Sequence, residues 1–332
     1  MTGPAPTPLT DWRALHGSHF ESRRALVTGG AGFIGSHLAD ALLALGAEVR
    51  VIDDLSSGRS ENLPKGAALI RRSITEADAI DHVFAGVDYV FHEAAMASVP
   101  LSVERPADFL HVNVTGTMNV LQAAARAKVR RLVFAASSSA YGESEVLPKT
   151  ESMPPMPLSP YAASKLAGEA LLRAWANCYG IDTASLRYFN IFGPRQTADS
   201  AYAAVIAAFA KAMLKSQHPT IFGDGEQSRD FTYVDNAVHA NLLAARSDKA
   251  LKGDVFNVAC GQRVTLNELA RVMRESLNRS DLTPVHQPPR AGDVRHSLAD
   301  LSHTRAGLGY EPIVAFEPGL RATMAWYQSI LK

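Results

Sequence analysis

The chain has 332 residues, and its 33 Lys plus Arg balance 33 Asp plus Glu, so the formal net charge at pH 7 is zero. No basic run occurs in the sequence, so we expect neither nucleic acid nor a membrane as a partner. The length predicts either one large sheet with attachments or two unequal lobes that share a cleft. These features favour a protein that handles small molecules.

The first 22 residues are rich in Pro and Thr and lack a continuous apolar core. We therefore expect neither a secretory signal nor a membrane span there, and predict a loose arm with one short helix around Trp12. The two cysteines, Cys178 and Cys260, show neither metal-ligand spacing nor a disulfide framework. We interpret them as reduced core thiols of a cytoplasmic protein, and we predict no metal site.

From Arg24 onward, short β-branched segments alternate with Ala- and Leu-rich stretches, which is typical of βαβ units. Strands are predicted at 25–28, 48–52, 68–70, 89–92, 131–135, 183–187 and 255–258, and the main helices at 35–45, 107–127 and 161–179. The predicted fold class is α/β, with a doubly wound parallel sheet of about seven strands. After residue 187 the loops become richer in Gly, Pro and isolated Arg, which predicts a smaller C-terminal α/β substrate lobe.

The segment "VTGGAGFIG" follows the first predicted strand and opens the first helix. Gly30, Gly32 and Gly35 fit the general dinucleotide pattern, in which bare backbone lets a pyrophosphate approach the N-terminus of a helix. Asp53 ends the next strand, where a carboxylate accepts hydrogen bonds from ribose hydroxyls and repels a 2′-phosphate. The pattern predicts NAD rather than NADP as cofactor. The alternative is that Asp53 or Asp54 is a helix cap or a turn residue.

Tyr161 and Lys165 in "SPYAASKLAG" are four residues apart, so a helix places them on one face. A nearby ammonium and a positive nicotinamide ring would both lower the pKa of the phenol and make it a usable base. Ser137 ends the fifth strand at the edge where this helix should lie, and its hydroxyl can polarise a substrate oxygen. Serines at strand ends more often satisfy loop backbone, so this inference depends on the Tyr161 and Lys165 pair.

Collinear blocks then carry a resemblance over nearly the whole chain from Arg24: "TGGAGFIGSHL", with Gly29, Gly32 and Gly35 at short-chain dehydrogenase spacing, then "FHEAAMASVP", "NVTGTMNVL", "AASSSAYG", "SPYAASKLAGE", "LRYFNIFGPRQ", "GDGEQSRDFTYVDN" and "GDVRHSLADLS". They resemble the extended short-chain dehydrogenase/reductase family, and within it the nucleotide-sugar 4-epimerases that act on UDP-N-acetylhexosamines.

The resemblance implies a Rossmann sheet and a reversible C4 epimerisation of a UDP-hexose through a 4-keto sugar, with bound NAD. Ser137, Tyr161 and Lys165 would be the catalytic residues. The implied cofactor-binding residues are Gly29, Gly32, Phe33, Ile34, Asp53, Asp54, His92, Asn113, Tyr161 and Lys165. His92 can equally be a structural histidine with satisfied hydrogen bonds. A homodimer through the helices at 107–127 and 161–179 is also implied.

The resemblance further implies substrate contacts, namely Ala97, Ser138, Ser139, Asn190, Gln196, Ala204, Arg229, Arg290 and Ser297. Asn190 would hold the UDP diphosphate, and Arg229 and Arg290 would clamp it, although a single Arg is more often a solvated surface residue. A small Ser297 leaves room for a 2-acetamido group. Two positions depart from the family pattern: Ser73 replaces an Asp that contacts adenine, and Ala97 replaces a Gly, which trims the acetamido space.

We therefore expect an arm at 1–22, an NAD-binding domain at 23–187 to which 236–262 return, and a UDP-sugar lobe at 188–235 and 263–332. The expected function is UDP-GlcNAc/UDP-GalNAc 4-epimerase with some UDP-Glc/UDP-Gal activity. A UDP-glucuronate 4-epimerase or decarboxylase stays open as an alternative. A non-catalytic dinucleotide sensor is the alternative from another class.

Overall fold

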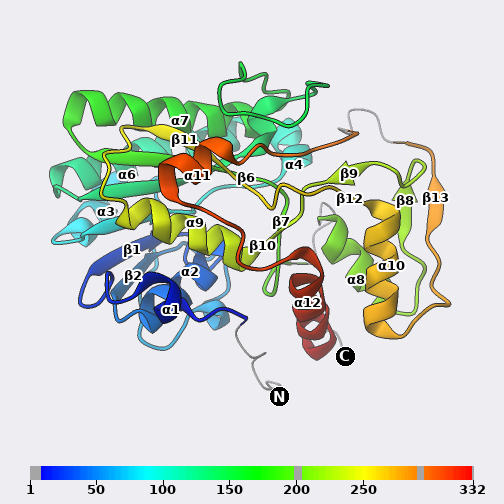
Figure 1. Ribbon diagram of the computed structural model, residues 1–332. Coiled ribbons are helices and arrows are strands. Elements are labelled where there is room, and N and C mark those ends of the chain that lie inside the picture. The colour runs from blue at the N-terminus through cyan, green and yellow to red at the C-terminus, as the bar shows by residue number, and fades with distance from the viewer. Residues whose placement is uncertain (1–8, 198–203, 290–294, 331–332) are drawn as a thin grey trace.

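The computed structural model describes residues 9–197, 204–289 and 295–330 (Figure 1). Seven parallel strands form one sheet in the order β11-β6-β5-β4-β1-β2-β3. Their bounds are β1 (Arg24–Thr28), β2 (Glu48–Ile52), β3 (Ala68–Ile70), β4 (Tyr89–His92), β5 (Arg131–Ser137), β6 (Asp182–Tyr188) and β11 (Asp254–Val258). The predicted α/β class and seven-stranded parallel sheet are confirmed. The strand order reverses between β1 and β4, which is where ligands bind in such sheets.

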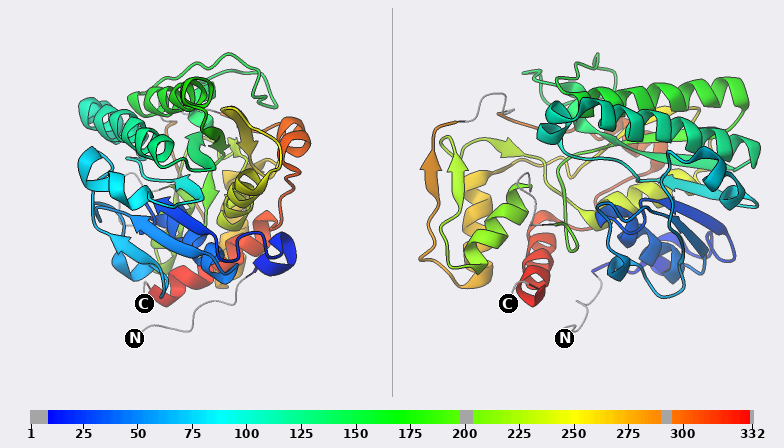
Figure 2. Two further views of the ribbon diagram at one scale, coloured as in Figure 1. Left: turned by 90° about the vertical axis from the view of Figure 1, so that its left-hand side faces the viewer. Right: turned by 180° about the vertical axis from the view of Figure 1, so that it is seen from behind.

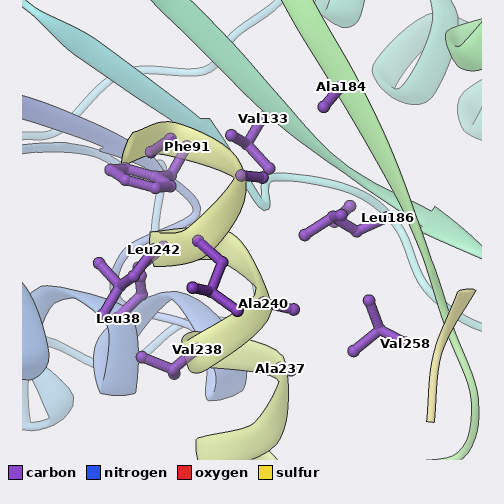
Figure 3. Packing of buried hydrophobic residues seen from close by; sticks show 14 of the residues in the cluster. Leu38, Phe91, Val133, Ala184, Leu186, Ala237, Val238, Ala240, Leu242 and Val258 are labelled. Atoms are coloured by element: carbon purple, nitrogen blue, oxygen red, sulfur yellow. The ribbon is translucent and has the colours of Figure 1, made fainter. Parts of the chain in front are cut away.

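Helices cover both faces of this sheet, so its central strands are buried on both sides and read as continuous apolar runs. One face carries α3 (Ala77–Ile80), α6 (Gly116–Arg126) and α7 (Pro160–Tyr179), and the other carries α2 (Phe33–Ala44), α9 (Val234–Arg246) and α11 (Ser302–Leu308). Figure 3 shows Ala237, Val238, Ala240 and Leu242 of α9 packed beneath Phe91 and Val133 of the sheet. The two apolar clusters fix the sheet between its helical layers.

Helix α7 is bounded by residues that favour helix ends. The Ser159 hydroxyl accepts a hydrogen bond from Ala162 N, Pro160 occupies the first turn, and Gly180 ends the helix in the left-handed region. The helix predicted at 107–127 is instead divided into α5 (Pro106–Leu110), a π-helical turn (His111–Thr115) and α6. Such π turns mark sites where one residue is displaced to serve another contact.

The C-terminal lobe forms around its own apolar cluster beside the sheet (Figure 2). It holds three short strand pairs, β7 (Ile191–Phe192) with β10 (Thr232–Tyr233), β9 (Ser228–Arg229) with β12 (Val264–Thr265), and β8 (Thr220–Phe222) with β13 (Val285–Gln287). Its helices are α8 (Val205–Leu214), α10 (Leu266–Leu277) and α12 (Phe316–Ile330). Helix α11 differs from the expected assignment, because Leu301, Leu308 and Tyr310 join the cluster on the α9 face of the sheet.

The remaining short elements are α4 (Val99–Glu104) and the 3₁₀ turns Ser60–Asn62, Asp81–Phe84 and Ser138–Tyr141.

Two expectations, about the N-terminal residues and about the cysteines, need correction. Helix α1 (Trp12–His16) forms as predicted, but residues 9–22 are not loose, because Phe20 is fully buried and His16 Nε2 lies 3.0 Å from His239 Nδ1 on α9. Cys178 is exposed on the last turn of α7 and is therefore not a core thiol, whereas Cys260 is half-buried.

Candidate active site

The glycine-rich turn joins β1 to α2 and leaves bare backbone at the N-terminus of that helix. Gly29 has φ +70°, and a Cβ added there would lie 2.7 Å from the Ala94 Cα atom, so only glycine fits. A Cβ on Gly35 would lie 2.3 Å from the Gly29 carbonyl oxygen. Gly32 precedes the first helical residues, Phe33 and Ile34, so the free N–H groups of α2 start there. This cradle fits a dinucleotide pyrophosphate.

Asp53 stands at the end of β2, beside the same turn. Its carboxylate accepts hydrogen bonds from Ala31 N (2.9 Å) and Leu55 N (2.8 Å), and burial raises its pKa. Each oxygen keeps a second lone pair that can accept from a ribose hydroxyl. Asp54 is exposed and accepts from Ser56 N, as a turn residue does. Asp53 therefore fits the predicted ribose contact, and Asp54 fits the alternative turn role.

His92 and Asn113 hold the loop that follows β4. His92 is fully buried, its ring nitrogens lie 2.6 Å from Thr28 Oγ1 and 2.9 Å from Thr117 Oγ1, and burial lowers its pKa to about 3. Asn113, in the π-helical turn, accepts from Met96 N and donates to Met96 O and to Ser164 Oγ. The geometry thus favours the structural alternative for His92. A contact of either residue with the cofactor stays a prediction.

Ser137, Tyr161 and Lys165 come together at the carboxyl end of β5. Lys165 is 4% exposed, and its Nζ donates to the Ala135 carbonyl oxygen at 2.7 Å. The same ammonium lies 4.9 Å from the centre of the Phe134 ring, within cation–π range. A side-chain interaction with Ser137 lowers the pKa of the Tyr161 phenol. A hydroxyl, a phenol and an ammonium therefore converge at one strand end, as the sequence predicted.

The lowering of the Tyr161 pKa, predicted with a nearby ammonium and a bound nicotinamide ring, is not present in the protein by itself. Burial raises the pKa of Tyr161, and the interaction with Ser137 offsets only part of this rise. The ammonium of Lys165 is directed to the Ala135 carbonyl, and burial lowers its pKa in turn. The phenol therefore stays protonated at neutral pH until a further positive charge reaches it.

The serines after Ser137 form the 3₁₀ turn at the end of β5. Ser139 donates both its backbone N–H (3.2 Å) and its hydroxyl (2.9 Å) to Ser137 Oγ. With its oxygen accepting from Ser139, the Ser137 hydroxyl proton is available to a further oxygen. Ser138, in the same turn, is half-buried. The sequence prediction of a substrate contact for Ser138 and Ser139 is not tested by this geometry, which gives Ser139 a role in orienting Ser137.

Three residues that the sequence analysis did not single out complete this centre. Tyr188, at the end of β6, donates its phenol proton to Glu93 Oε1 at 2.7 Å, and Asn241 of α9 donates to Tyr188 Oη at 2.6 Å. Glu93 directly follows the buried strand β4. A carboxylate at the carboxyl edge of a parallel sheet, printed in "VFHEAA", was the signal that could have identified it.

Two residues predicted to contact the substrate, Asn190 and Ser297, are brought together from distant segments; we call this region the sugar side. Asn190, in the left-handed region at φ 41°, donates to Ser297 Oγ and to the Asp230 carbonyl oxygen, both at 3.2 Å. The buried Asp230 carboxylate accepts from the backbone of Cys260, Gly261 and Ala299, and burial raises its pKa to about 6. Asp230 therefore fixes the Ser297 strand segment against the end of β11.

The other predicted substrate residues that the structure describes come from separate segments of the chain. Arg229 Nη1 donates to the carbonyl oxygens of Ser228 (3.0 Å) and Arg295 (3.2 Å), and Gln196 Nε2 donates to Ile191 O. Ala97, after β4, and Ala204, before α8, are exposed. Arg290 lies outside the described residues. Their role in substrate binding stays a prediction.

Within the described ranges, no group of three His, Cys, Asp or Glu side chains is arranged to hold a metal ion. None of the helices in the described part of the chain combines the length and apolar character needed to cross a bilayer.

Comparison with known proteins agrees with this geometry. The family model "NAD dependent epimerase/dehydratase family" matches residues 25–259. Among solved structures, a UDP-N-acetylglucosamine 4-epimerase from Methanobrevibacter ruminantium, in complex with UDP-N-acetylmuramic acid, is 41% identical, with a TM-score of 0.89, 93% of this chain covered and 99% of that one. The UDP-glucose 4-epimerase from Thermotoga maritima, with UDP-glucose, is 40% identical, with a TM-score of 0.88 and coverages of 93% and 100%.

Among curated relatives, the UDP-glucose 4-epimerase of Mycolicibacterium smegmatis is 39% identical over 313 residues, which cover 92% of this chain and 99% of that protein. The family match spans more than half of the chain, and these relatives match along almost their entire length. The chain therefore belongs to the NAD dependent epimerase/dehydratase family, and its cofactor is NAD.

Proposed function

We propose that this protein is an NAD-dependent UDP-hexose 4-epimerase that interconverts UDP-GlcNAc and UDP-GalNAc and has some activity on UDP-Glc and UDP-Gal. The convergence of Ser137, Tyr161 and Lys165 at the end of β5 carries the proposal. The 4-epimerase relatives at about 40% identity support the reaction class. The substrate is argued from residues of this chain.

NAD, when bound, supplies a reversible hydride acceptor for the sugar C4 and a positive charge beside the phenol. Tyr161 would remove the proton of the C4 hydroxyl as C4 gives up its hydride. After the 4-keto sugar has turned and C4 has taken the hydride back on its other face, Tyr161 would return the proton, so the hydroxyl would have the opposite configuration. Ser137, oriented by Ser139, donates to the C4 oxygen and stabilises charge that develops there. Lys165 holds its ammonium at the carboxyl end of β5, where the positive charge favours the phenolate form of Tyr161.

The small Ser297 supports N-acetylated substrates. Its hydroxyl is already bonded to Asn190 and to Asp230 N, so its position is fixed rather than free to rotate. A serine here leaves more room beside the hexose than an aromatic residue would. Ala97 acts in the opposite direction, because its methyl group occupies space that a glycine would leave, and this supports retained activity on plain hexoses.

Two rival reactions fit the residues less well. A 4,6-dehydratase needs an adjacent acid pair to eliminate water, and this chain has Ser138 and Ser139 after Ser137. A UDP-glucuronate decarboxylase is expected to have a glutamate near Ser139, and the residues beside it are Ser138 and Ala140, with the first glutamate at Glu143. A UDP-glucuronate 4-epimerase shares the catalytic residues, so it stays the second candidate. A non-catalytic sensor usually lacks the Tyr or the Lys, and this chain has both.

The deciding experiment is to incubate the purified protein separately with UDP-GlcNAc, UDP-Glc and UDP-GlcA and to resolve the products by NMR. Conversion of UDP-GlcNAc to UDP-GalNAc at the highest rate is expected. Turnover of UDP-GlcA alone would select the uronate epimerase. Binding of NADH with no turnover of the three sugars would support the sensor.

We further propose a homodimer through the layer formed by α5, the π-helical turn, α6 and α7. Large apolar side chains are exposed there, with Leu110 at 45%, Met118 at 36% and Tyr179 at 62%. These helices lie side by side on the outer face of the sheet in both views (Figures 1 and 2). Sedimentation that detects only monomer at micromolar concentration would reject the dimer.

A further inference from the structure

We propose that Glu93 is a positioning residue that supplies the counter-charge of Lys165 and is held in place for this by Tyr188 and Asn241. The inference rests on the proposed function, because it concerns the same catalytic centre. It begins from sheet geometry. The parallel register pairs His92 with Phe134, so Glu93 follows beside Ala135, whose carbonyl oxygen accepts from Lys165 Nζ at 2.7 Å. Glu93 and Lys165 therefore lie at the same pair of strand ends.

The hydrogen bonds at Glu93 have a fixed direction. Asn241 Nδ2 donates to the Ala237 carbonyl oxygen at 2.9 Å, which can only accept, so the orientation of the amide is set. The same Nδ2 donates to the Tyr188 oxygen, which directs the phenol proton of Tyr188 onto Glu93. Glu93 is therefore the acceptor at the end of this chain of donors. Burial raises the pKa of Glu93 to about 7, and these donors act against that rise, so Glu93 is an anion in the alkaline range where burial places the Lys165 pKa, at about 8.

Lys165 has few other groups that could balance its charge. One proton of its ammonium goes to the neutral Ala135 carbonyl, and the Phe134 ring faces it. Glu169 is one helical turn further along α7, but Arg187 holds both of its oxygens at 2.8 Å, and that pair is already neutral as a unit. Glu93 is the carboxylate whose charge raises the pKa of Lys165 against the lowering caused by burial.

The other titratable groups around this centre do not take over that role. His92, on β4, has a pKa lowered to about 3 by burial and is neutral in the working range. Tyr188, on β6, has a raised pKa because it is buried, so it is neutral as well. Tyr161, on α7, is neutral in the protein by itself, and it is the same residue in the parent and in every variant compared below, so its charge cancels in the comparison. Loss of the Glu93 charge should therefore lower the pKa of Lys165 with no compensating anion, and the ammonium should be lost at lower pH.

The test is a pH titration of the lysine 13Cε resonances in the NAD-loaded protein, with the Lys165 signal assigned by its absence in Lys165→Arg. In Glu93→Gln, which keeps the acceptor oxygen for Tyr188, the titration midpoint of Lys165 should fall by about one pH unit. Glu145→Gln removes an exposed carboxylate by the same chemistry and should leave the midpoint unchanged.

A second variant keeps the inference testable if Glu93→Gln does not fold. Tyr188→Phe removes the donor to Glu93, which raises the pKa of that carboxyl and should lower the Lys165 midpoint by a smaller amount. In the double variant the Tyr188→Phe effect should vanish, because it acts through Glu93. The alkaline limb of kcat/KM for UDP-GlcNAc should move to lower pH in parallel.

An unchanged Lys165 midpoint in folded Glu93→Gln would overturn the inference. So would equal Tyr188→Phe effects in both backgrounds. Because the titration needs no turnover, it also stands apart from the proposed reaction. A parent protein that converts none of the sugars would contradict the proposed function while the titration still decides the role of Glu93.

Discussion

The two sides of the site are built in different ways. The cofactor side is made of short, consecutive segments, in which a strand ends, a glycine turn follows and a helix begins. The sugar side joins Asn190, Asp230 and Ser297, which meet only through long connections in the C-terminal lobe. The comparison places the proposed catalytic residues on the ends of sheet strands and the proposed substrate contacts on loop segments, which tolerate sequence change better than strands do.

The largest effect should come from the rigid side. Tyr161→Phe removes the group that transfers the proton of the sugar hydroxyl and should reduce kcat for UDP-GlcNAc by at least about a hundredfold, since general acid–base groups contribute about 10²- to 10⁴-fold. Initial rates of UDP-GalNAc formation, followed by NMR, would measure the loss. The NAD content and the melting temperature should match the parent, because the ring stays in place. A variant as fast as the parent would contradict the proposed mechanism.

The next prediction concerns stability rather than catalysis, through the buried ion pair that joins Glu169 of α7 to Arg187 of β6. Glu169→Gln leaves the Arg187 guanidinium buried without its anion, and Arg187 and Glu169 are 4% and 6% exposed. Loss of one partner of a buried pair costs about 3–5 kcal/mol, so the free energy of unfolding in urea should fall by that order. Glu275→Gln, which breaks the exposed pair with Arg271, is the matched control and should leave the urea midpoint unchanged. Equal midpoints for both variants would show that the buried pair adds nothing.

The sugar side should respond selectively. Ser297→Tyr narrows the space beside the hexose and should reduce turnover of UDP-GlcNAc by about 10- to 100-fold, with UDP-Glc within a few-fold of the parent. The ratio of the two kcat/KM values is the measurement. Ser302→Tyr, on the exposed start of α11, adds the same ring away from the site and should leave the ratio unchanged. Equal losses for both sugars would refute the role of Ser297 as a gate.

The same division explains what the sequence predicted. The seven strands, the glycine turn and the pairing of Tyr161 with Lys165 depend on neighbours within about one helical turn, so local patterns were sufficient. The structural roles of Glu93 and Asp230 depend on contacts with Tyr188 and with the backbone of Ala299, which no spacing in the sequence reveals. In the protein by itself the Tyr161 pKa is raised, because burial, which sequence does not give, outweighs the interaction with Ser137. The lowering predicted with a bound nicotinamide ring stays a prediction.

The docking of residues 9–22 was also missed, since its contacts with α9, such as that between His16 and His239, join residues more than two hundred positions apart. It provides the smallest expected effect. His16 and His239 contact each other in a buried interface, and burial lowers their pKa values to about 3 and about 4 from 6.5. Because the folded-state values are the lower ones, the unfolded chain takes up protons first as pH falls. This contribution to stability is complete above about pH 6.5 and is lost progressively toward pH 4.

The free energy of unfolding in urea should therefore fall between pH 7.5 and pH 5 in the parent protein. The fall should be smaller in the double variant His16→Gln/His239→Gln. The drop in the parent should exceed the drop in the double variant by, at most, the free energy that corresponds to the uptake of two protons on unfolding, one for each histidine. His92 and His37 are buried with lowered pKa values in both proteins, so part of the drop should persist. His82→Gln changes an exposed histidine and should keep the full drop. Equal drops in the double variant and the parent would mean that residues 9–22 detach from the sheet before the pH falls low enough to protonate His16 and His239 in the docked state. Residues 9–22 would then be a separable segment rather than part of the sheet domain.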